Sequence, residues 1–133
     1  MGAARLLLVA MLLVSAPARA QDGGWQAARA HARCVALAPD RDAHQRHLSA
    51  GYTLLKRTVE QEAGTRSAAD LLAAHMGASR AEVAAYLYGE MIAEARQQVR
   101  DAMPQAVREE RTPGDRDRWR VAEYDRTKCA SRP

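Results

Sequence analysis

The sequence predicts an all-α protein, a small bundle of four to five helices in one domain, with one disulfide joining the first and last helices. Two observations predict the class. Apolar residues recur at spacings of three and four along residues 21–133, and the alternating, β-branched runs that are typical of strands are missing. A third observation predicts the crosslink, because the two cysteines stand near opposite ends of that region.

An export signal is predicted for residues 1–20. Arg5 forms a basic flank, an apolar run of nine residues follows, and Ala18 and Ala20 are the small residues that precede a cleavage site. A membrane-spanning helix needs roughly 20 apolar residues, about twice this run, so a cleaved signal is favoured over a membrane anchor. Residues 21–133 are then expected to be a single helical domain that is periplasmic or secreted.

Cys34 and Cys129 are expected to pair. In an oxidising compartment an even number of cysteines most simply forms disulfides, and closing so long a loop stabilises by about 4–5 kcal/mol in the chain-entropy model. A reactive thiol pair is the alternative, but the Cys-x-x-Cys spacing of redox enzymes is missing. His31, one turn before Cys34, would activate a free thiol, and a disulfide removes that nucleophile.

The first two helices are expected at about 24–38, with Asp22 as N-cap, and from Asp40 or Asp42 to a point before Gly64. Each carries an apolar stripe on one face. The stripes are Trp25, Ala28, Ala32 and Val35 on the first, and Leu48, Tyr52, Leu55 and Val59 on the second.

Two capping boxes predict the next helices. Ser67 with Asp70 resembles a capping box with Asp in place of Glu, and it opens a short helix that Gly77 closes. Ser79 with Glu82 is a better match, and it opens the longest helix of the chain. The apolar residues of this longest helix recur every four positions: Val83, Leu87, Met91, Ala95 and Val99.

The last third of the chain begins with a break. Pro104 ends or kinks the longest helix, and residues 112–115 have Pro and Gly where a type II turn requires them. A final helix is expected over about 115–129. Its inner face is predicted to carry Trp119, Ala122 and Cys129.

Residues 69–87 resemble a helix-turn-helix, with Gly77 at the turn, which would suggest a DNA-binding regulator. Three observations oppose this. The chain has an export signal, its net charge falls from +4 to about +2 without that signal, and the supposed recognition helix carries Glu82, Glu90 and Glu94. A capped corner between two helices explains the same residues, so no nucleic-acid partner is expected.

His44 and His47 are the candidate metal ligands. They lie one turn apart beside Asp40 and Asp42, a mixture of nitrogen and oxygen donors that suits a divalent metal. The same residues also match an ordinary solvated helix start, where aspartates favour the positive end of the helix dipole. Histidines elsewhere would add ligands only if the fold brought them near.

No catalytic residue is assigned. Glu90 with Glu94, and Glu60 with Glu62, are carboxylate pairs, but acid–base catalysis also needs a desolvated carboxyl group beside a cleft. Phosphate-binding loops, nucleophile elbows and zinc-protease motifs are missing from the sequence, and no cofactor is implied. A non-catalytic role is therefore favoured over an enzyme.

A partner surface is a further hypothesis, because arginine and aromatic residues are enriched at protein–protein hot spots. The alternative is an exposed helix laced with ion pairs, whose aromatic residues face the core. We expect a protein that binds another macromolecule of the bacterial cell envelope, of inhibitor, immunity or adaptor type; the alternative is a metal-binding protein built on the two histidines. The candidate surface residues are Arg108, Arg111, Arg118, Trp119, Arg120 and Tyr124.

Overall fold

The computed structural model describes residues 16–62 and 68–133, and this part of the chain contains helices and no strand. The prediction of an all-α fold is confirmed. One helix, α6, is a single turn, so five of the described helices are longer, as the sequence predicted. The helices are α2 (Ala16–Leu37), α3 (Arg41–Gln61), α4 (Ala68–Met76), α5 (Arg80–Ala102), α6 (Gln105–Arg108) and α7 (Asp115–Arg126).

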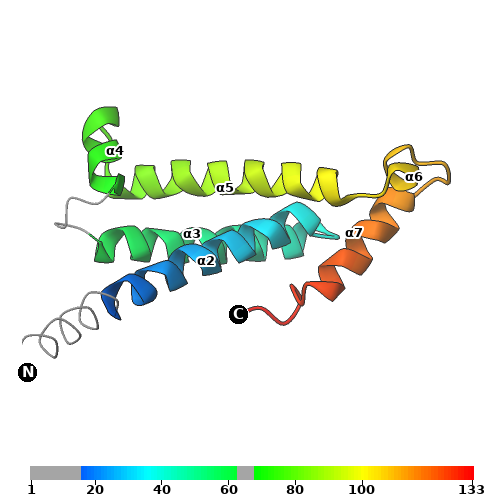
Figure 1. Ribbon diagram of the computed structural model, residues 1–133, viewed down its shortest axis with the longest axis horizontal. Helices are drawn as coiled ribbons and strands as arrows, with labels where there is room; N and C mark the ends of the chain where they lie inside the picture. The colour runs from blue at the N-terminus through cyan, green and yellow to red at the C-terminus, as the bar shows by residue number, and fades with distance from the viewer. Residues whose placement is uncertain (1–15, 63–67) are drawn as a thin grey trace, which may run out of the picture.

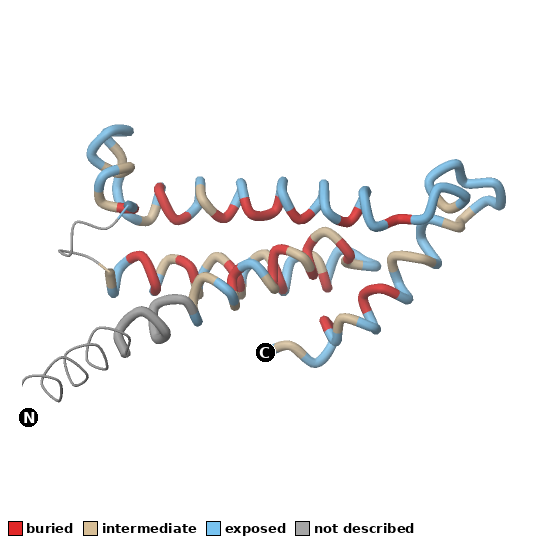
Figure 2. Tube along the Cα trace, in the orientation of Figure 1, coloured by how far each residue is buried: buried red, intermediate tan, exposed pale blue. Residues whose placement is uncertain are grey.

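Three long helices form the body of the molecule. Helices α2, α3 and α5 contact one another along their lengths, α4 stands at one end of α5, and α7 folds back from the other end to reach α2 (Figure 1). Helices α2 and α3 run antiparallel: Trp25, early in α2, donates a hydrogen bond of 2.8 Å to Glu62, just beyond α3. Figure 2 shows the buried residues of α5 on the side that faces α2 and α3.

The main core lies between these three helices. Ala28 and Ala32 of α2 are completely buried, and their small side chains let α2 approach both neighbours closely. The predicted stripes are confirmed, with Trp25, Leu48, Tyr52 and Leu87 only partly buried at the edges. The other buried members include Val35, Leu55, Val59, Val83, Tyr88, Met91, Ile92 and Ala95.

Gly51 permits a close contact between α3 and α5. A β-carbon at this position would lie 2.0 Å from the hydroxyl oxygen of Tyr88, so only glycine fits. The Tyr88 hydroxyl donates to the backbone oxygen of His47 at 2.8 Å. Burial raises the pKa of Tyr88, and the phenol stays a neutral donor.

The predicted N-caps of α3 and α5 are observed. Asp40, rather than Asp42, caps α3 by accepting a hydrogen bond of 2.8 Å from the backbone of Ala43. Ser79 and Glu82 form the complete capping box of α5. The other predicted box lies partly outside the described residues, as do the first fifteen residues of the predicted export signal.

Three helices end with a residue in the left-handed conformation: Gly77 after α4, Glu110 after α6 and Lys128 after α7. Each end shows the paired hydrogen bonds of a Schellman motif. After α7 the backbone N–H of Cys129 donates to Tyr124 at 3.1 Å. This turn directs Cys129 back toward α2.

The type II turn predicted at residues 112–115 is confirmed. Gly114 has φ 82° and ψ 4°, and the N–H of Asp115 donates to the carbonyl of Thr112 at 3.1 Å. Pro104 ends α5, as expected. The single turn α6, which the sequence pattern does not predict, fills the segment between Pro104 and the type II turn.

Two predicted helix features are wrong. Helix α2 already begins at Ala16, so Asp22 lies inside the helix and does not cap it. Ala122 of α7 is exposed, and Glu123 and Tyr124 are buried in its place. An acidic residue was not expected inside, but Arg33 of α2 and Arg126 compensate the charge of Glu123.

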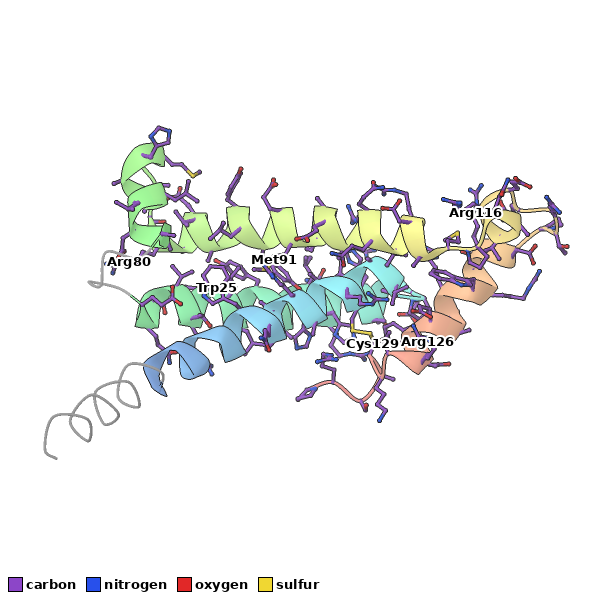
Figure 3. The ribbon with its side chains drawn as sticks, viewed as in Figure 1. Trp25, Arg80, Met91, Arg116, Arg126 and Cys129 are labelled. Atoms are coloured by element: carbon purple, nitrogen blue, oxygen red, sulfur yellow. A yellow bond between two sulfur atoms is a disulfide. The ribbon has the colours of Figure 1, made fainter. Side chains whose placement is uncertain are left out.

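The predicted disulfide is confirmed. Cys34 of α2 and Cys129 are bonded, with their Cα atoms 5.6 Å apart and a sequence separation of 95 residues (Figure 3). Cys129 lies just after α7, because that helix ends at Arg126. A structural disulfide is typical of an oxidising environment outside the cytoplasm. Among the described helices, none is both long enough and apolar enough to span a membrane.

Candidate functional site

The two predicted metal ligands have different surroundings. His44 is partly exposed, whereas His47 is completely buried and uses both ring nitrogens in contacts with other side chains. In residues 16–62 and 68–133, no three His, Cys, Asp or Glu side chains gather as they would around a metal. The geometry therefore does not supply the donor set that the metal hypothesis requires.

His47 instead belongs to a buried polar chain that joins α2, α3 and α7. Its Nδ1 lies 3.0 Å from Nδ1 of His31, and its Nε2 lies 2.8 Å from the hydroxyl oxygen of Tyr124. Arg46 donates to the same hydroxyl oxygen at 2.9 Å. The sequence separations are 16 and 77 residues for the two histidine contacts, so spacing along one helix could not reveal them.

One assignment of protons satisfies every hydrogen bond of this buried polar chain. Arg46 can only donate, so the hydroxyl proton of Tyr124 is free to go to Nε2 of His47. His47 then donates from Nδ1 to Nδ1 of His31. The remaining proton of His31 is left for the backbone oxygen of Pro133, with which the ring interacts. Both imidazoles are neutral in this arrangement.

The surroundings favour this neutral state. Burial is the main cause that lowers the pKa of His47 to about 4, and His31, Arg46 and Arg132 lower it further. Burial also lowers the pKa of His31, Arg132 adds to the effect, and the backbone oxygen of Pro133 opposes it. At neutral pH, the buried polar chain therefore contains uncharged imidazoles and holds α7 against α2 and α3.

A basic cleft lies between α5 and α7, beside the end of α2. Its volume is about 500 Å³, and Ala36, Val99 and Met103 give it apolar walls. The other lining residues are charged. They are Arg96, Arg100, Arg116, Arg120, Glu110 and Asp117.

The two carboxylates do not neutralise the four guanidinium groups of this basic cleft. Arg120 pairs with Asp117 at 2.5 Å, and Arg116 lies 3.8 Å from Glu110. Among the described residues, Arg96 and Arg100 form no ion pair, and the Nε atom of Arg120 is buried without a hydrogen-bond partner. The cleft therefore presents an excess of positive charge and unused donors, which suit an anionic ligand.

The predicted partner surface overlaps this cleft only at Arg120. Arg108, Arg111 and Arg118 are exposed on the α6–α7 corner, and Trp119 is partly buried. Tyr124 is buried in the polar chain, so its assignment to the surface is wrong. The prediction missed the two arginines of α5 because α7 reaches them only by folding back along the bundle.

No protein-family model, curated protein or solved structure matches the chain.

Proposed function

We propose that this chain is an exported, non-catalytic protein that binds a protein partner in the cell envelope, as an inhibitor, immunity or adaptor protein. Residues 1–20 direct its export, and the helical domain acts in the periplasm or after secretion. The disulfide supports the proposal, because such bonds persist in oxidising compartments. The basic cleft is the binding site, and an acidic segment of the partner occupies it.

The observation that carries this proposal is the excess of guanidinium groups over carboxylates in the basic cleft. Arginine binds carboxylates through two parallel hydrogen bonds, which gives affinity and fixes orientation. Val99 and Met103 supply apolar area between the charges. A peptide segment that combines Asp or Glu with an apolar side chain matches both properties.

The architecture also suits a binder. The disulfide, the buried polar chain and the ion pair between Arg33 and Glu123, 3.2 Å long, all hold α7 against α2. One wall of the cleft is thereby fixed before any partner arrives. Such preorganisation reduces the entropy lost on binding.

The test is a pull-down from envelope extract with the exported protein as bait, followed by titration of the captured partner. The variant Arg96→Gln/Arg100→Gln is expected to weaken binding at least about tenfold, because it removes two charge-assisted contacts. Arg57→Gln is the control, since Arg57 is exposed on α3 and does not line the cleft. Recovery of no partner under several conditions, or equal affinity of the double variant, would overturn the proposal.

A further inference from the structure

A second hollow, a groove of about 730 Å³, lies between α2 and α3. Its walls are small or apolar, with Ala27 from α2 and Ala50 and Leu54 from α3. Arg46 and Arg132 line it as well. From Arg46 to Leu54 the helix rises by about 12 Å, so the groove is elongated, with charge near one end and apolar side chains beyond it.

Among the described residues, Arg46 and Arg132 have no side-chain carboxylate beside them in this groove, which Pro133, the last residue of the sequence, also lines. No carboxylate side chain lines the groove, and within the described residues neither Arg46 nor Arg132 forms an ion pair with one. The Nε atom of Arg132 is buried and has no hydrogen-bond partner there. His31, which also lines the groove, has its pKa lowered by burial and then by the charge of Arg132.

We propose that this groove binds an amphipathic anion with a single alkyl chain, a fatty-acid type of carboxylate. Its head group contacts Arg46 and Arg132, and its chain lies along Ala27, Ala50 and Leu54. The volume is within the range of small-molecule sites, which are mostly apolar with a few polar groups that fix the ligand's orientation. Guanidinium groups fit a carboxylate head group, and the apolar walls remove the alkyl chain from water.

This groove is separate from the basic cleft, and the two sets of lining residues do not overlap. The groove, however, contains His31 and Arg46, which belong to the buried polar chain that holds α7. A bound head group is therefore expected to perturb the ring resonances of His31. Binding of the head group in the groove leaves the charges of Arg96 and Arg100, in the basic cleft, unchanged.

The experiment uses the exported protein, freed of bound lipid, and titrates decanoate calorimetrically below its micellar concentration. Decanoate is expected to bind saturably, with one molecule per chain, and to shift the ring signals of His31. Decyltrimethylammonium, decanol and acetate serve as ligand controls, because each lacks the negative head group or the long alkyl chain. We expect each of these three to bind far more weakly than decanoate.

Two variants locate the site. Arg132→Gln is expected to weaken decanoate binding about tenfold by removing a charge-assisted contact, and Ala50→Trp is expected to block the groove. Arg57→Gln and Arg96→Gln/Arg100→Gln are matched controls that should bind decanoate normally. Circular dichroism verifies that each variant is folded. Equal binding of the cationic ligand, or unchanged decanoate affinity in folded Arg132→Gln, would overturn the inference.

Discussion

His47 is a residue whose ionisation state depends on contacts from every element around it. It faces His31 on α2, Arg46 on its own helix, Tyr124 on α7 and Arg132 near the end of the chain. None of these groups is an acid that would stabilise a charged imidazole, and the side chain is completely buried. The folded protein therefore resists protonation of His47, whereas the unfolded chain does not.

We predict that acid destabilises the fold before its carboxylates are protonated. The unfolded state gains a proton at His47 near pH 6.5, but the folded state gains it only near pH 4. Stability is therefore complete above pH 6.5 and falls by about 3 kcal/mol as the pH approaches 4, at about 1.4 kcal/mol per pKa unit. Urea unfolding across this pH range measures the slope.

The variant His47→Gln should show a shallower slope, because it removes one of the two histidines with lowered pKa values. His75→Gln is the control, since His75 is exposed on α4. A slope in His47→Gln as steep as that of the unmodified protein would contradict the explanation.

At the scale of elements, the conformation at each helix end determines the direction of the segment that follows. The Schellman motif after α7 places Cys129 for its disulfide, yet the left-handed position of that motif is occupied by Lys128, with φ 55°. A residue with a β-carbon is strained in this conformation, by roughly 1 kcal/mol. The corresponding position after α4 is Gly77, which is free of that strain.

We predict that Lys128→Gly raises the free energy of unfolding by about 0.5–1 kcal/mol, because it relieves the left-handed strain. Gly77→Ala is the reverse case and should lower it by about 1 kcal/mol. Chemical denaturation of the two variants measures both effects. A loss of stability in Lys128→Gly would show that the Lys128 side chain contributes more than its backbone strain costs.

At the scale of the whole molecule, α7 is attached to the bundle by few but strong links. The disulfide joins residues 95 positions apart, and the other links are the Arg33–Glu123 ion pair, the buried polar chain and a small apolar cluster in which Tyr124 packs with Leu37 and Val99. The main core, by contrast, lies in α2, α3 and α5, with Ala69 of α4 at its end. Loss of the disulfide should therefore loosen α7 more than the rest.

We predict that Cys34→Ala/Cys129→Ala lowers the free energy of unfolding by about 4 kcal/mol. Affinity at the basic cleft should fall as well, although no residue that lines the cleft is changed. Reduced, unmodified protein is the control and should match the double variant. The intact mass of exported protein should rise on reduction by the mass of two hydrogen atoms; free thiols in the native protein would contradict the pairing.

Local patterns were sufficient for most of the helical architecture. The four-residue spacing of apolar side chains along α5, the caps at Asp40 and Ser79, and Gly77 all report on interactions within a few residues. Such interactions depend on helix geometry and backbone hydrogen bonding, which are visible in a short stretch of sequence. The cysteine pair could also be predicted, because only one intramolecular pairing exists.

The sequence by itself thus determined the class of fold, most helix boundaries and the disulfide. Only the tertiary structure decided that His47 meets His31 rather than His44, that Tyr124 is buried, and that arginines of α5 and α7 share a cleft. The physical reason is that contacts between helices depend on their relative register and orientation. Side-chain packing across the whole chain sets this register and orientation, and the periodicity of apolar residues within one helix does not predict them.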